Sequence, residues 1–132
     1  MAETRRRKAG AINRSILGLL GRTGLPLSAN AIVQELAALG ERICPSQAFR
    51  ALARLCDDRL IHRVELVNGY VAGQPGQTIN LVCDGCGKVA RVAAPDLFRD
   101  LATLARHAGL IPGRLVVEST GLCGQCGIAD RQ

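Results

Sequence analysis

The sequence predicts an α+β protein in two parts, a mainly helical first part that ends in a β-hairpin and a smaller α/β second part. Three observations predict this division. Apolar residues recur at helical spacing in three successive stretches of the first half, and an Asn-Gly pair between two β-prone runs follows them. Two Cys-x-x-Cys pairs stand in the second half. A chain of 132 residues is long enough for one ordinary domain or two very small ones. The smaller of two such domains would need additional stabilisation, such as a structural zinc ion.

Three helices are expected in the first half. The first is expected to end at Gly21, because its apolar pattern stops there. Ser28 is a natural N-cap for the second helix, which Gly40 ends. Pro45 opens the third helix, which runs to about residues 57–58, since proline is tolerated in a first turn. The apolar positions are Ile12, Ile16, Leu19 and Leu20 in the first helix, Ile32, Leu36 and Leu39 in the second, and Ala48, Leu52, Leu55 and Cys56 in the third.

A β-hairpin is expected directly after the third helix. Residues 60–66 and 70–72 are rich in Ile, Val and Leu, and Asn68 with Gly69 between them is a strong hairpin signal. Three short helices followed by a hairpin are the order of a winged helix, a DNA-reading module whose third helix enters the major groove. The sequence therefore predicts a winged-helix, DNA-binding domain over residues 1–73.

The distribution of charge favours a nucleic-acid partner for the first half. Residues 1–74 hold eleven Lys and Arg against six Asp and Glu, a net charge of +5, whereas residues 75–132 carry +1. A basic half of this kind is typical of a surface that meets a polyanion. The basic run that includes Arg6 and Arg7 can add salt-dependent affinity for DNA without reading its sequence. A cationic surface that only keeps the protein soluble is the alternative.

The third helix supplies side chains that can read double-stranded DNA. A helical wheel places Gln47, Arg50, Ala51 and Arg54 opposite the apolar stripe. The lengths and donors of Gln47, Arg50 and Arg54 suit base edges and phosphates, so these three are predicted DNA-binding residues. An ordinary solvated helix face is the alternative.

The second half is expected to hold a small α/β domain after a hinge at residues 74–77. The expected strands are residues 78–82, 88–92 and 114–120. One helix opens at Pro95 and is stopped by Gly109. Its apolar stripe consists of Leu97, Leu101, Leu104 and Ala108. Three strands and one helix cannot bury both faces of a sheet alone, so residues 78–132 are predicted to be a dimerisation domain that adds strands across a two-fold axis.

Four cysteines of the second half are predicted to bind a structural zinc ion. The pairs are Cys83 with Cys86 and Cys123 with Cys126, and 36 residues separate them. Two cysteines at this spacing present both thiolates from one tight turn, and two such turns complete a tetrahedral S4 shell without an open position for a substrate. The sequence thus predicts one structural Zn²⁺ per chain. Redox dithiols and surface disulfides are the alternatives.

Several motifs make the chain similar to the ferric uptake regulator family, and above all to its zinc uptake regulator branch. The motifs are residues 43–52 (ICPSQAFRAL), 60–65 (LIHRVE), 68–71 (NGYV), 83–89 (CDGCGKV) and 118–126 (ESTGLCGQC). The resemblance covers about residues 10–127 and implies a homodimeric winged-helix transcriptional repressor with a dimerisation domain stapled by the four-cysteine zinc. Such a dimer would place two recognition helices on one face of a duplex, which predicts a palindromic operator.

The resemblance assigns roles to neighbouring residues of the third helix. Phe49 and Arg50 fall where the family usually has Tyr-Arg, the pair that contacts a thymine and a guanine or phosphate. Phe49 keeps the aromatic ring and loses the hydroxyl, so it is a predicted DNA-binding residue, with packing in the core as the alternative. Gln47 replaces the family's usual Thr and would alter the operator that is read.

The resemblance also implies a regulatory metal between the domains, and here the chain departs from the family. Of the usual histidine, cysteine and acidic ligands only His62 remains as a candidate. Arg91 stands where an acidic ligand is expected, the hinge contains no ligand, and His107 is expected on a helix surface. One imidazole cannot hold a transition metal tightly, since three or four ligands are needed. We therefore expect the regulatory metal site to be absent.

Two other functions remain open from the sequence. One is a zinc-stapled protein-interaction module that dimerises with or modulates another regulator, and the other is a thiol oxidoreductase. No paired carboxylates, nucleophile triad or phosphate loop appear, so neither an enzyme nor a small-molecule substrate is expected. The apolar runs are far below the ~18 residues of a membrane span and no signal peptide is recognisable, so a cytoplasmic protein without a membrane partner is expected. Cys44, at the start of the third helix, is either redox-active or structural.

Overall fold

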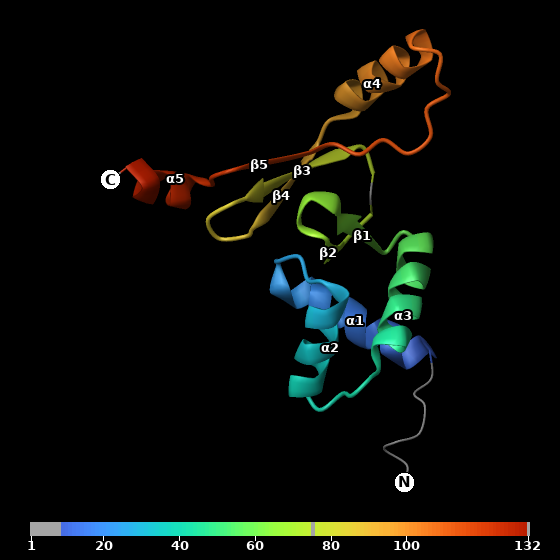
Figure 1. Cartoon of the computed structure of the whole chain (residues 1–132), viewed down its shortest axis with the longest axis vertical. Coiled ribbons are helices and arrows are strands. Elements are labelled where there is room, and N and C mark those ends of the chain that lie inside the picture. The colour runs from blue at the N-terminus through green and yellow to red at the C-terminus, as the bar shows by residue number, and fades with distance from the viewer. Residues whose placement is uncertain (1–8, 75, 132) are drawn as a thin grey trace. The chain divides into compact units, whose positions relative to one another are not determined.

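The computed structural model describes residues 9–74 and 76–131 and shows the α+β fold class that the sequence predicts (Figure 1). The chain divides into two compact units, Met1–Gln74 and Pro75–Gln132. The first unit contains α1 (Ala9–Thr23), α2 (Ala29–Ala38), α3 (Pro45–Asp57), β1 (Ile61–Val64), a 3-10 turn (Glu65–Val67) and β2 (Gly69–Ala72). The second unit contains β3 (Thr78–Cys83), β4 (Val89–Ala93), α4 (Pro95–His107), β5 (Glu118–Gly121) and α5 (Gly124–Arg131). Each helix of the described residues is too short or too polar to cross a bilayer.

The three helices of the first unit pack around one apolar core. Ile16, Ile32 and Leu52, one from each helix, are at most 1% exposed. Ser28 caps α2 as predicted, because its Oγ accepts a hydrogen bond of 3.1 Å from the amide of Ala31. The apolar spacing in the sequence therefore places these helices correctly.

The end of α1 differs from the prediction. The helix continues through Gly21 to Thr23 and stops before Gly24, whose φ of +69° is left-handed. A glycine inside a helix costs only about 1 kcal/mol relative to alanine, so the apolar packing of α1 outweighs it. The prediction that α1 ends at Gly21 is wrong. The backbone stays helical through Gly21 and becomes left-handed only at Gly24.

β1 and β2 form the predicted antiparallel hairpin, with every residue of one strand paired to the other. The connection is longer than a two-residue turn, because Glu65–Val67 form a 3-10 turn and Asn68 is left-handed with φ of +52°. The first strand is accordingly shorter than the sequence predicts. Two backbone hydrogen bonds between Leu27 and Tyr70, of 3.1 and 2.8 Å, fasten the hairpin to the chain before α2. Residues 61–72 are called the wing below.

The second unit is built on a three-stranded sheet with the order β4-β3-β5. β3 pairs antiparallel with β4 and parallel with β5, and the parallel pairing sets Cys83 opposite Gly121. β5 begins only at Glu118, so most of the strand predicted over residues 114–120 is loop. α5 was not predicted, and it starts directly after Cys123. The sheet thereby brings the two Cys-x-x-Cys pairs to one end of the unit.

α4 forms at the predicted place, but one chain does not bury its predicted apolar stripe. Phe98 is the buried residue of this helix, whereas Leu97 and Leu104 are 40% and 62% exposed. In the loop after α4, Leu110 and Ile111 are 65% and 95% exposed. Large apolar side chains of the second unit therefore remain in contact with water in the single chain.

Candidate metal centre and DNA-binding surface

The four cysteine sulfurs converge at the end of the sheet. Cys83 ends β3, Cys86 lies in the turn that follows, and Cys123 and Cys126 lie just before and within α5. Their four sulfur atoms lie within 4.8 Å of one another, and the sulfurs of Cys86 and Cys123 are 3.9 Å apart. Four sulfurs arranged as a tetrahedron around zinc at about 2.3 Å would be separated by about 3.8 Å. The residues present therefore fit a structural zinc, as the sequence predicts.

The backbone around the cysteines is shaped for thiolates. The amides of Gly85 and Cys123 each donate a hydrogen bond of 3.3 Å to the sulfur of Cys83. Backbone donation, led by that of Cys123, lowers the pKa of Cys83 to about 6. Hydrogen bonding with the side chains of Cys123 and Cys83 raises the pKa of Cys126 to about 12. A divalent cation would offset this effect, because it favours the deprotonated form of every thiol that binds it.

Gly85 shows how tightly the two cysteine turns approach each other. A Cβ at this position would lie 2.7 Å from the sulfur of Cys126, closer than real Cβ atoms come to any neighbour. A side chain at residue 85 would therefore push the second turn away from the first. The Cys-x-Gly-Cys form of the first pair is thus required by the geometry of the cluster.

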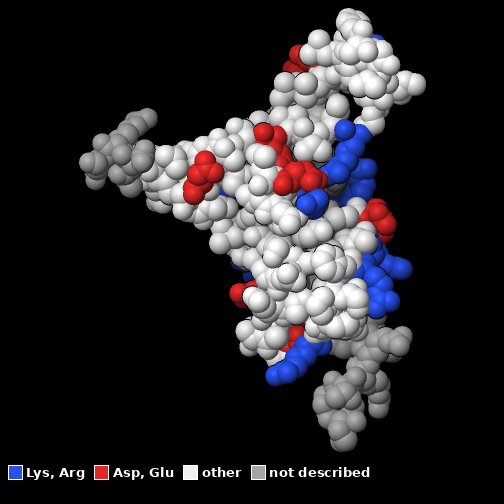
Figure 2. Space-filling model, viewed as in Figure 1, with Lys and Arg blue, Asp and Glu red and all other residues white. Residues whose placement is uncertain are grey.

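The outer side of α3 presents cationic and aromatic side chains. Arg50 and Arg54 are exposed, and Phe49 is 55% exposed, so the alternative that Phe49 packs in the core is wrong. Lys and Arg side chains gather along the side of the first unit where α3 lies (Figure 2). Ala51 was assigned to the polar face of the helix but is 7% exposed and belongs to the core. Arg6 and Arg7 lie outside the described residues.

The first turn of α3 uses Gln47 and Cys44 as a cap. The amide of Cys44 donates a hydrogen bond of 2.9 Å to Oε1 of Gln47, which is half-buried. The Cys44 sulfur is exposed and lies 3.2 Å from the hydroxyl of Ser46. Hydrogen bonding by Ser46 lowers the pKa of Cys44. Gln47 therefore helps to cap the start of α3. The spacing of residues 44 and 47 is that of a capping box, so the sequence could have indicated this role.

His62 is buried at the base of the wing. Its side chain is 7% exposed, and its Nδ1 lies 3.1 Å from the carbonyl oxygen of Gly73, to which it donates when protonated at that nitrogen. Gly73 has a left-handed φ of +113°. Within residues 9–74 and 76–131, the group of His, Cys, Asp and Glu side chains that can hold a metal is the cysteine quartet. Arg91 is exposed and donates to Thr78 within the sheet.

The chain matches known regulators in sequence. It is 34% identical to the zinc uptake regulation protein of Escherichia coli (strain K12) over an alignment of 87 residues, with a coverage of 62% of this chain and 51% of that protein. The protein of the same name from Shigella flexneri gives the same values. The chain thus spans about half the length of the curated relatives it matches. No family model matches the chain.

Solved structures extend this similarity over nearly all of the fold. A zinc uptake regulator complexed with zinc and DNA has a TM-score of 0.84 and 27% identity, covering 91% of this chain and 83% of that one. Holo XcZur has a TM-score of 0.81 and 26% identity, covering 95% and 90%. The ferric uptake regulator of Francisella tularensis with iron, at 17% identity and a TM-score of 0.66, shares the fold. These relatives are named as regulators, in agreement with the expectation that the chain is not an enzyme. In sequence and in fold, the chain is similar to zinc uptake regulators.

Proposed function

We propose that the protein is a sequence-specific DNA-binding transcriptional regulator that acts as a repressor. The observation that carries this proposal is the match of 91% of the chain to a zinc uptake regulator solved with zinc and DNA. The exposure of Phe49, Arg50 and Arg54 on α3 supports it, because a recognition helix needs accessible donors and apolar surface for base edges. A cytoplasmic location, where DNA and reduced thiols occur together, belongs to the same proposal.

In this proposal the side chains of α3 divide the work of binding DNA. Arg50 donates to a base edge or phosphate, Phe49 packs against a thymine methyl group, and Arg54 donates to the phosphate backbone. Gln47 reaches DNA only with the amide nitrogen, since its Oε1 caps the helix. Arg6 and Arg7 add phosphate contacts and so contribute salt-dependent affinity.

The active form in this proposal is a homodimer joined through the second unit. Exposed Leu104, Leu110 and Ile111 support it, because a single chain leaves these side chains in water and a second copy can bury them. The structural zinc would hold the turn after β3 to the start of α5 and so keep this unit folded. Two copies related by a two-fold axis present two α3 helices to DNA, which calls for a palindromic operator.

We expect one tightly held zinc ion per chain and no second, regulatory metal. The absence of a second ligand cluster supports this, because the cysteine quartet is the group of at least three His, Cys, Asp or Glu side chains that converges among the described residues. Metal analysis after exhaustive dialysis should give one zinc per chain, and added zinc should leave the affinity for DNA unchanged. Cys44→Ser, which removes a thiol outside the quartet, should keep that stoichiometry. Two tightly held ions per chain would contradict the expectation.

A further inference from the structure

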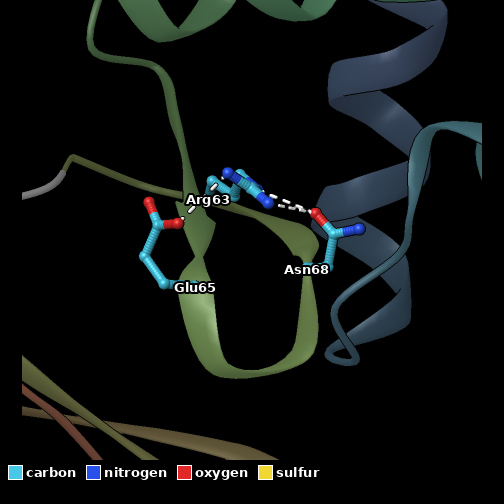
Figure 3. A network of polar contacts seen from close by, with 3 residues as sticks. All are labelled: Arg63, Glu65 and Asn68. Carbon is cyan, nitrogen blue, oxygen red and sulfur yellow. Dashed lines mark hydrogen bonds and ion pairs between the residues drawn. The ribbon is translucent and has the colours of Figure 1, made fainter.

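The wing contains a polar network that centres on one arginine (Figure 3). The Nε and Nη2 groups of Arg63 both donate to Oδ1 of Asn68, the first at 2.9 Å. Nη1 of the same guanidinium lies 3.1 Å from a carboxylate oxygen of Glu65. Glu65 is the first residue of the 3-10 turn and Asn68 caps its end. One planar side chain on β1 therefore joins the two ends of the turn that forms the tip of the wing.

The side chains at the tip of the wing are not buried in the core. No residue of the turn is buried, and Leu66 and Val67 are 54% and 41% exposed. The amide of Asn68 donates a backbone hydrogen bond of 3.3 Å to the carbonyl of Glu65 and so closes the turn. A turn held in this way opens at little cost, so side-chain contacts across it decide how ordered it is.

The guanidinium is also occupied by these partners. Three of its roughly five N–H donors point at Asn68 and Glu65, and the Glu65 carboxylate offsets its charge. A lysine has no planar fork and could not hold both partners at once. These contacts are better suited to ordering the wing than to direct binding of a phosphate by Arg63.

We propose that Arg63 is the positioning residue of the wing: it holds residues 65–68 in one conformation before DNA binds, acting through Asn68 and Glu65. This inference rests on the proposed function. Its consequence is a lower entropic cost of binding, because the tip need not be ordered at the moment when it meets the duplex. Arg63 thereby contributes to affinity without contributing to the number of neutralised phosphates.

The test compares Arg63→Met, Arg63→Lys and Asn68→Gly in the zinc-loaded full chain. Asn68→Gly removes the Oδ1 acceptor at a left-handed position that glycine adopts without strain. Arg99→Met is the matched control, since Arg99 is another exposed arginine paired with an acid and lies on α4. The probes are amide hydrogen exchange of residues 65–69 in the free protein and the affinity for a labelled random-sequence duplex at several salt concentrations.

Arg63→Met and Asn68→Gly should each speed exchange in the wing about ten-fold and weaken DNA binding about five-fold. The slope of log affinity against log salt should stay that of the unmodified protein, and Arg63→Lys should behave like Arg63→Met. A slope smaller by about 0.9 in Arg63→Met would mean a direct phosphate contact and overturn the inference. Full affinity in Arg63→Lys, or unchanged exchange, would also overturn it.

The exchange measurement separates this inference from the proposed function. If the unmodified protein binds no duplex, the proposed function fails and so does any role of the wing in it. If the unmodified protein binds DNA while Arg63→Met neither speeds exchange nor weakens binding, the proposed function stands and the role of Arg63 falls.

Discussion

Removal of the zinc ion is expected to unfold the second unit and to leave the helical first unit folded. The buried apolar side chains of the second unit among the described residues are Val82, Cys83 and Phe98, too few to support a fold of this size. Structural zinc contributes about 10–16 kcal/mol to the folding of small zinc domains, so its loss should outweigh that core. Amide NMR spectra recorded before and after chelation would resolve the two units.

Cys86→Ser should act like the chelator, because three thiolates leave the S4 shell incomplete. Cys56→Ala, a change outside the quartet, is the control and should retain the zinc. Acid should act in the same direction, because zinc needs deprotonated thiols and protons compete with the metal for them. A second unit that stays folded and dispersed without zinc would contradict a structural role for the metal.

Arg50→Ala is expected to weaken operator binding by about 5- to 150-fold, corresponding to about 1–3 kcal/mol for one base-reading arginine. The side chain of Arg50 is exposed on α3, where it can reach a guanine or phosphate without moving the core. Fluorescence anisotropy with a labelled operator and with a scrambled duplex measures the effect. Loss of discrimination between the two duplexes should accompany the loss of affinity.

Two further variants distinguish base reading from phosphate contact and from unrelated effects of losing an arginine. Arg54→Ala should weaken both duplexes alike and lower the salt slope by about 0.9, as expected for a phosphate contact. Arg99→Ala, on α4 of the other unit, should change neither affinity nor discrimination. Equal binding of both duplexes by Arg50→Ala and the unmodified protein would show that α3 does not read the operator.

Local chemistry made much of this fold predictable. The cap at Ser28, the proline at the start of α3 and the spacing of the cysteine pairs each act over a few residues, so the sequence alone identifies them. Together with the apolar spacing and the Asn-Gly pair, these signals predicted the order of three helices and a hairpin. The convergence of Cys83 with Cys123 depends on the parallel pairing of β3 and β5, yet the tetrahedral preference of zinc made that convergence predictable.

Burial was harder to predict than secondary structure. A helical wheel gives the angle of a residue but not the depth of its neighbours, so it assigned Ala51 to the polar face and left Phe49 undecided. The predicted stripe of α4 is not the buried side of the helix in the single chain, because Phe98 is buried whereas Leu97 and Leu104 are exposed. Gln47 was predicted only as a DNA-binding residue. The hydrogen bond from the Cys44 amide shows that its Oε1 also caps α3.

The environment of His62 was also not predictable from the sequence. The sequence identifies His62 as a remaining candidate ligand, but only the structure reveals that the ring is buried and hydrogen-bonded to Gly73. An imidazole fixed in this way stabilises the base of the wing.

Sequencing of genomic fragments retained by the purified, zinc-loaded protein tests whether the protein reads a specific DNA sequence without a regulatory metal. One arm contains added free zinc and the other contains none beyond the structural ion. We expect the same AT-rich palindrome to be enriched in both arms. Enrichment only with added zinc would contradict the absence of a regulatory site, and no enrichment in either arm would contradict the assignment as a DNA-binding regulator.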